Sequence, residues 1–258
     1  MNTIRDRLWI WGHEVGSHDR EYNTPAPSRM TPVEGACYLN VPNMIMVRYE
    51  GRPAPPYDQY ARAFRPFNQF VWSIVGAGGE TSEEEIDHVR RLAEQNPNMT
   101  GFMMDDFFRN DADQTVVYSP GQLADIRKRL VIEDRPLDLW VVLYQYQLDR
   151  PVQDHLVHCD VVSYWTWQAE RLTELEDDFA RLEALSPQTR KVLGCYMWDY
   201  GNKKPMPLDL MKHQCEIGLR WLEEGRIEGM VFLASCICDL DIQAVEWTRG
   251  WIEEIVNQ

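Results

Sequence analysis

Three aspartates stand at the ends of apolar segments, where carboxylates could take part in chemistry. In the run "TGFMMDDFF" (100–108), Asp105 and Asp106 follow the apolar residues of its first part. Asp199 lies within "YMWDYG" (196–201). Two carboxyl groups in different protonation states can act as an acid and as a base or nucleophile. Neighbours on a strand point to opposite faces, so we expect only one of the adjacent pair to face a site: Asp106, the later residue, is favoured, and Asp105 is the alternative. Asp199 is the predicted second carboxylate, although each aspartate could instead anchor a loop.

Aromatic and polar side chains accompany these aspartates at the ends of the apolar runs. Tryptophan faces stack on the C–H faces of sugars, while carboxylate, amide and imidazole groups hydrogen-bond to hydroxyls. We therefore expect a neutral carbohydrate ligand. Glu170 could instead begin the acid-rich helix that follows it. The predicted binding residues are Trp11, His13, Glu14, Trp72, Tyr144, Trp165, Trp167, Glu170 and Trp198.

The elements that must position these residues alternate along the whole chain. Continuous apolar strands are typical of parallel sheets that are covered on both faces. Eight such runs, each followed by a helical pattern, predict an α/β fold: a (β/α)₈ TIM barrel in a single domain over residues 1–258. An open doubly wound sheet fits less well, because no G-x-G-x-x-G follows the first strand. The predicted strands are 7–14, 43–49, 68–76, 100–106, 137–146, 160–167, 191–201 and 227–237.

Composition and charge exclude several classes of partner. The net charge of −15 argues against a nucleic-acid or anionic-membrane partner, and no apolar stretch is long enough to span a membrane. No signal peptide is visible, and the six cysteines form no C-x-x-C, so free thiols and a cytoplasmic location are favoured. The H-x-H motif of metal-dependent barrels is missing from the first strand, so we expect neither a metal nor a cofactor. The oligomeric state is not indicated.

Together these features resemble the (β/α)₈-barrel glycoside-hydrolase-like proteins. "GFMMDDF" (101–107) is similar to a Gly-x-x-x-Asp-Asp-Phe ending of strand four in several such groups, and "YMWDYG" looks like the aromatic-acid exit of strand seven. The chain departs from the largest clan, which has Asn-Glu on strand four and Glu on strand seven, and it lacks the chitinase-type D-x-x-D-x-D-x-E. The resemblance implies cleavage of a glycosidic bond by Asp carboxylates at the C-terminal rim of the barrel. The alternatives are a carbohydrate-binding barrel without turnover and a metal-dependent sugar isomerase or epimerase.

Overall fold

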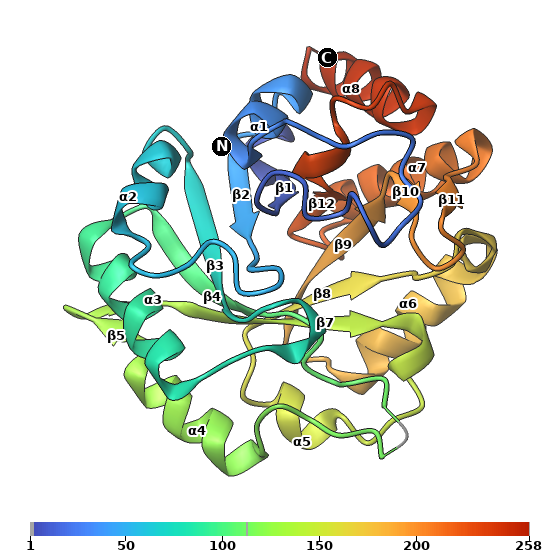
Figure 1. The fold of residues 1–258 in the computed structure, drawn as a ribbon. Coiled ribbons are helices and arrows are strands. Elements are labelled where there is room, and N and C mark those ends of the chain that lie inside the picture. The colour runs from blue at the N-terminus through green and yellow to red at the C-terminus, as the bar shows by residue number, and fades with distance from the viewer. Residues whose placement is uncertain (1–2, 112, 258) are drawn as a thin grey trace.

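The eight apolar runs form eight parallel strands that close into a barrel, which confirms the predicted (β/α)₈ fold (Figure 1). The computed structural model describes residues 3–111 and 113–257. Around the barrel the order is β1-β2-β3-β4-β7-β8-β9-β12, and β12 pairs with β1 to complete the ring. The bounds are β1 Leu8–Gly12, β2 Asn43–Met46, β3 Gln69–Val75, β4 Met99–Met104, β7 Asp138–Tyr144, β8 Val161–Trp165, β9 Arg190–Tyr196 and β12 Gly229–Leu233.

Helices form the outer layer, and several of them begin or end at capping residues. Thr31 and Ser119 each make a capping box at a helix start, and Gly225 ends α7 in a left-handed conformation. Between β2 and β3 the helical segment is only one α-helical turn, α2, followed by a 3₁₀ turn. The helices are α1 Pro32–Leu39, α2 Asp58–Ala61, α3 Glu83–Gln95, α4 Pro120–Arg129, α5 Gln153–Leu156, α6 Leu175–Leu185, α7 Leu208–Glu224 and α8 Gln243–Val256.

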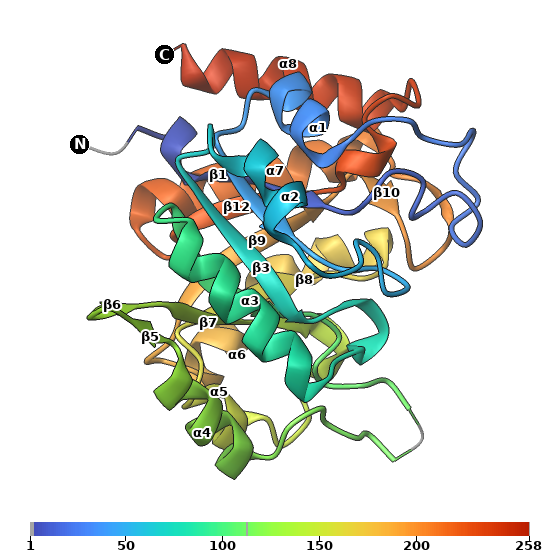
Figure 2. The same cartoon turned by 60° about the vertical axis from the view of Figure 1, so that its left-hand side comes forward.

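Two short hairpins interrupt the regular alternation. β5 Val131–Ile132 pairs with β6 Arg135–Pro136, and β10 Trp198–Asp199 pairs with β11 Lys204–Pro205. Figure 2 shows the β5–β6 hairpin at the opposite end of the barrel from β10. The run predicted as one strand over 191–201 therefore leaves the barrel wall after Tyr196, and the segment beyond it turns into a separate hairpin.

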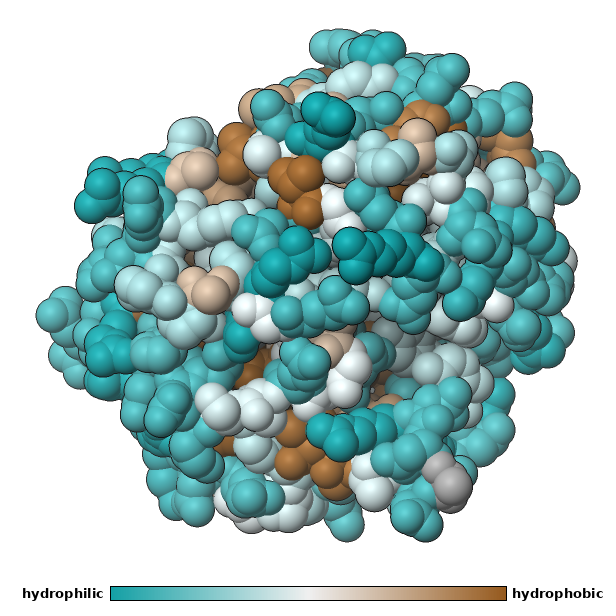
Figure 3. Space-filling model, in the orientation of Figure 1, coloured by the Kyte–Doolittle hydropathy of each residue, from teal (hydrophilic) through white to brown (hydrophobic). Residues whose placement is uncertain are grey.

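The surface is mainly polar. Figure 3 shows hydrophobic residues in small, separate spots on one face of the molecule, with hydrophilic residues between them. Among the described residues, no helix combines the length and apolar character that crossing a membrane requires. All six cysteines are free, and Cys37 alone is exposed.

Aromatic side chains fill the barrel near the C-terminal ends of its strands, and a glycine leaves space for one of them. A Cβ atom on Gly194 would lie only 2.0 Å from Cδ2 of Trp165. The Trp165 ring therefore lies directly across the backbone of β9. Its other neighbours include Trp11, with ring centroids 5.3 Å apart, so the two indoles pack edge to face.

We predict that Gly194→Ala destabilises the protein, because the added methyl group would overlap the buried Trp165 ring between two strands that cannot separate. The free energy of unfolding should fall by about 3 kcal/mol or more in urea denaturation followed by tryptophan fluorescence. Gly250→Ala in α8 is the matched control: its Cβ meets nothing within 4 Å. That helical substitution should raise stability by about 0.5–1 kcal/mol. Equal stability of Gly194→Ala and the parent would contradict this packing.

Candidate active site

A pocket of about 460 Å³, its open mouth included, lies at the C-terminal ends of the strands. Side chains from the barrel wall, including Val142 and Trp165, form its floor. We call it the inner pocket; it is lined by Trp11, His13, His18, Tyr22, Tyr49, Ala77, Asp105, Asp106, Val142, Tyr144, Trp165, Trp167, Tyr196, Tyr200 and Leu233.

A second, more open depression adjoins the inner pocket. It occupies about 1,080 Å³, open space included, and shares Tyr22, Asp106, Tyr144 and Trp167 with the inner pocket. Asp106 therefore lies at the junction of the two spaces. We call this depression the outer groove; its remaining lining residues are Glu21, Gly78, Phe108, Arg109, Asn110, Asp111, Tyr146 and Lys203.

Asp105 and Asp106 both face the inner pocket, so the expectation that they point apart is wrong. The alternation of side chains holds only while the backbone stays extended. β4 ends at Met104, and Asp106 adopts a left-handed conformation with φ 44°. The amide of Asp105 still donates to Val75 O on β3 at 2.9 Å, so the backbone turns directly after Asp105. Aspartate tolerates this conformation better than most residues.

Hydrogen bonds from the surrounding elements hold the carboxylate of Asp106. The backbone N–H of Gly78 donates to Oδ2 at 2.8 Å, and the hydroxyl of Tyr144 donates to Oδ1 at 2.9 Å. The two donors hold the side chain of Asp106 in one orientation. Burial and the charge of Asp106 raise the pKa of Tyr144, which therefore remains a phenol and a donor.

Asp105 lies in a different environment, which favours its neutral form. Its side chain is buried, and this burial, together with the neighbouring Asp106 charge, raises its pKa well above the usual range. The N–H of Asp106 donates to Asp105 Oδ1 at 2.9 Å and opposes this shift without cancelling it. The two carboxyl groups thus share one pocket, and burial favours the neutral form of Asp105.

Two neutral histidines line the opposite side of the pocket. His13 Nε2 accepts from Trp11 Nε1–H at 3.0 Å, and Nδ1 lies 2.9 Å from Val47 O, so the single imidazole proton is on Nδ1. Burial lowers the pKa of His13 to about 4. Burial also lowers the pKa of His18, whose Nδ1 lies 3.0 Å from the hydroxyl of Tyr200. At neutral pH both rings therefore carry no positive charge, and both ring nitrogens of His13 already have protein partners.

Asp199 lies outside both the inner pocket and the outer groove. It is fully buried in β10, where Oδ1 accepts the backbone N–H groups of Ala169 at 3.3 Å and Asn202 at 3.2 Å. The side-chain amide of Asn202 donates to Oδ2 at 2.9 Å. These contacts match the loop-anchoring alternative, because the carboxylate ties the β10–β11 turn to the loop after β8.

Two of the predicted tryptophans are also outside the pocket. Trp72 is fully buried and packs against Tyr57 and Phe64, with ring centroids 5.0 and 5.8 Å away, on the helical side of β3. Trp198 is buried in β10, and its indole N–H donates to the carbonyl of Tyr22 at 3.0 Å. Trp198 thus supports the loop that carries Tyr22 over the pocket.

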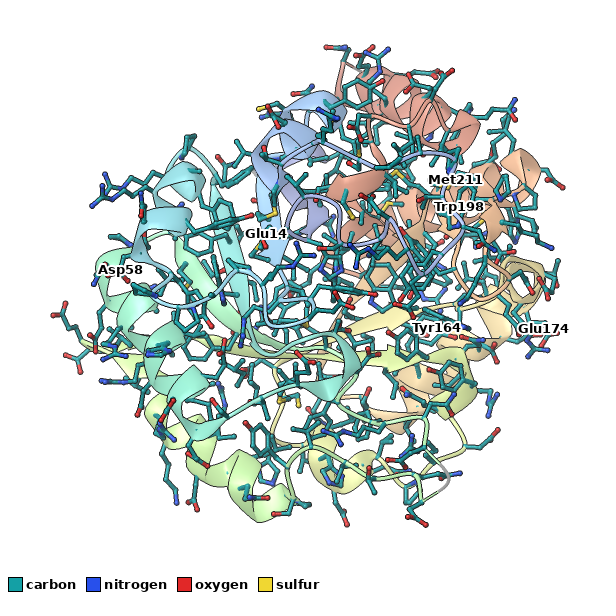
Figure 4. The ribbon with its side chains drawn as sticks, in the orientation of Figure 1. Glu14, Asp58, Tyr164, Glu174, Trp198 and Met211 are labelled. Carbon is teal, nitrogen blue, oxygen red and sulfur yellow. The ribbon has the colours of Figure 1, made fainter. Side chains whose placement is uncertain are left out.

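Glu14 and Glu170 lie at the periphery of the strand ends. Glu14 Oε2 is 3.8 Å from Arg52 Nε, and Glu170 accepts from the amide of Asn202 at 2.8 Å. Neither side chain lines the inner pocket or the outer groove. Figure 4 shows Glu14 and Trp198 well apart from each other. The structure brings together the other predicted residues: Trp11, His13, Asp105, Asp106, Tyr144, Trp165 and Trp167.

The structure adds several aromatic residues that were not predicted as site residues. Tyr196 ends β9, and Tyr200 lies in the turn between β10 and β11; both belong to the "YMWDYG" motif that also contains Asp199. Tyr22 comes from the long segment between β1 and α1, which has no periodic pattern from which its position could be predicted. His18 lies on the same segment. Within residues 3–111 and 113–257, no three His, Cys, Asp or Glu side chains gather closely enough to hold a metal ion.

The barrel is similar to solved structures of several enzymes. A putative α-L-fucosidase from Bacteroides thetaiotaomicron VPI-5482 has a TM-score of 0.62 at 12% identity, over 100% of this chain and 96% of that one. A mutant GH18 chitinase from Cycas revoluta in complex with (GlcNAc)4 has a TM-score of 0.60 at 12% identity, over 96% and 99%. A mutant tryptophan synthase α-subunit from Pyrococcus furiosus has a TM-score of 0.50 at 10% identity, over 100% of both chains.

These similarities concern the fold. No family model matches the sequence, and no curated protein matches it either. Most of these similar structures are glycoside hydrolases, as the resemblance in sequence predicts, while the tryptophan synthase subunit shows that the same barrel serves other reactions. The comparisons therefore show that the chain is a (β/α)₈ barrel, and they do not resolve its family.

The buried carboxyl of Asp105 predicts a pH-dependent stability. The pKa of Asp105 is higher in the folded than in the unfolded protein. The contribution of Asp105 to the free energy of unfolding is therefore complete below its unfolded pKa of about 4, and it is lost as the pH rises through its folded pKa. Asp105→Asn keeps an uncharged group of the same shape. The variant should therefore be more stable than the parent by a margin that grows from about pH 4 towards pH 9.

Thermal unfolding measured across this pH range tests the prediction. Asp177→Asn, at an exposed aspartate on α6, is the matched control and should show a much smaller pH-dependent difference from the parent. A stability margin of Asp105→Asn that stays constant or shrinks as the pH rises would show that Asp105 is ionised in the folded protein.

Proposed function

We propose that the protein hydrolyses a glycosidic bond, with a sugar residue bound in the inner pocket and the scissile bond beside Asp105 and Asp106. One observation carries the proposal: two adjacent carboxyl groups face one aromatic-lined pocket, one of them with a pKa raised by burial and the other held by hydrogen bonds from Gly78 and Tyr144. A neutral acid beside a carboxylate is the equipment that glycoside hydrolysis requires.

The environments of the two groups suggest separate roles. The neutral Asp105 donates its proton to the glycosidic oxygen as the bond to the anomeric carbon breaks. The Asp106 carboxylate, held by Gly78 and Tyr144, stabilises the positive charge that develops on the sugar ring. Water then supplies a hydroxyl to the anomeric carbon, and its remaining proton returns to Asp105.

The rest of the pocket suits a neutral sugar. Trp11, Trp165 and Trp167 offer aromatic rings, while the uncharged His18, whose Nδ1 bonds to Tyr200, can use Nε2 to bond to a hydroxyl group. The chitinase with the same type of barrel is bound to (GlcNAc)4, which supports a carbohydrate as the ligand of this fold. At a net charge of −15, a neutral substrate also avoids the repulsion that an anionic one would meet.

We predict that Asp105→Asn and Asp106→Asn differ in their dependence on the leaving group. After a screen of chromogenic glycosides and polysaccharides has identified the sugar, kcat/KM is measured on an alkyl glycoside and on the 2,4-dinitrophenyl glycoside. Asp105→Asn should lose about 10²–10⁴-fold on the alkyl glycoside, whose departure requires a proton, but little on the dinitrophenyl glycoside. Asp106→Asn should lose activity on both, because charge stabilisation is needed in each case.

Asp199→Asn separates the pair from the third aspartate. We expect it to lower thermal stability, because Asp199 anchors a buried turn, and to leave kcat/KM per folded molecule unchanged on both substrates. If Asp106→Asn instead lost activity on the alkyl glycoside but kept it on the dinitrophenyl glycoside, Asp106 would be the proton donor and Asp105 the stabilising carboxylate. Full activity of Asp106→Asn would refute the mechanism, and sugar binding without turnover in the parent would identify a binding protein.

A further inference from the structure

The outer groove continues the inner pocket past Asp106. Tyr22, Asp106, Tyr144 and Trp167 line both spaces, so one ligand can contact them from either side. The floor of the inner pocket consists of barrel side chains, and a glycan chain cannot extend through it. A ligand longer than one sugar residue must therefore extend outwards, across Asp106 and into the groove.

The groove has an exposed aromatic platform in the right place. Tyr146 is 40% exposed, whereas Tyr144 is only 7% exposed. The two rings stack with centroids 5.2 Å apart and an interplanar angle of 6°. One face of Tyr146 is thus covered by Tyr144, and this stacking holds the ring parallel to a residue that donates to Asp106. A fixed aromatic face is a good partner for the C–H face of a pyranose.

The wall of the groove is held in place by the element that supplies the platform. Arg150, which follows Tyr146 in the same βα connection, donates to the carbonyls of Arg109 at 2.9 Å and Gln114 at 2.6 Å. Gln147 donates to the carbonyl of Phe108 at 2.7 Å. These bonds fix the segment after Asp106 relative to Tyr146, so the groove is formed before any ligand binds. A preformed site binds its ligand at a lower entropic cost.

We propose that the outer groove is the leaving-group subsite of the proposed glycosidase and binds a sugar residue by stacking on Tyr146. The substrate is then a disaccharide or longer glycan that is cleaved at its non-reducing end: the terminal residue occupies the inner pocket, and the next residue occupies the groove. The cleavage of the glycan in this inference rests on the proposed function, whereas the binding of a sugar to Tyr146 does not depend on it.

A kinetic comparison of two substrates tests the subsite. A glycosyl fluoride of the accepted sugar has a leaving group too small to reach Tyr146, whereas the corresponding disaccharide fills the groove. Tyr146→Ala should lower kcat/KM on the disaccharide by about tenfold, mainly through KM, and change that on the fluoride by less than about twofold. Tyr146→Phe, which keeps the ring, should behave like the parent on both substrates. Equal losses on both substrates, or no loss on the disaccharide, would overturn the proposal.

A binding measurement separates failure of the subsite from failure of the proposed function. Calorimetry is carried out on the parent, Tyr146→Ala and Tyr146→Phe with cellobiose, maltose, lactose and N,N′-diacetylchitobiose, each beside the monosaccharide of its non-reducing end. For at least one pair the parent should bind the disaccharide about tenfold more tightly, and Tyr146→Ala alone should lose that advantage. If the parent shows this binding pattern but hydrolyses none of the sugars, the subsite is supported and the proposed function is refuted. The absence of any such advantage in the parent would overturn the subsite.

Val131→Ala is the matched surface control. Val131 is 50% exposed and lies on β5, at the other end of the barrel. Its truncation removes an exposed apolar side chain far from the groove and should change neither the binding ratio nor the kinetic ratio. An effect of Val131→Ala as large as that of Tyr146→Ala would show that the loss does not arise in the groove.

Discussion

Closure of the sheet by the pairing of β1 with β12 is the constraint on which the site depends. Leu8 to Trp11 align with Met230 to Leu233, so the first and last strands become neighbours. Closure directs the C-terminal ends of all eight strands to one rim. Residues as distant in sequence as Trp11 and Leu233 then line the same pocket, together with the aspartates after β4. An open sheet would spread these side chains along an edge.

The rim of the barrel could be predicted from the sequence, but the direction of individual side chains could not. Apolar runs and the helical patterns between them were sufficient to predict the eight βα units, because burial decides both patterns. The orientation of Asp106 depends on a backbone turn at φ 44° and on donors from Gly78 and Tyr144, which belong to other connections. Asp199 lies outside the site, contrary to the prediction, because β9 ends at Tyr196 and a hairpin follows.

The pair of aspartates combines two opposing requirements. Burial raises the pKa of Asp105 and favours its neutral form, but a buried carboxyl group weakens the folded state as soon as it ionises. The hydrogen bonds from Gly78 and Tyr144 hold the side chain of Asp106 beside it. Burial keeps His13 and Tyr144 uncharged at neutral pH, so neither adds a charge to the pocket.

The close approach of Trp165 to Gly194 makes two positions on neighbouring strands interdependent. The indole that forms part of the pocket floor occupies the volume that any side chain at position 194 would need. Evolutionary exchange at either position is therefore conditional on the other: a larger residue at 194 becomes admissible only after a smaller one has replaced the tryptophan. Related proteins should therefore differ at both positions together. A homologue that keeps glycine at the position of Gly194 should also keep a large aromatic residue at the position of Trp165.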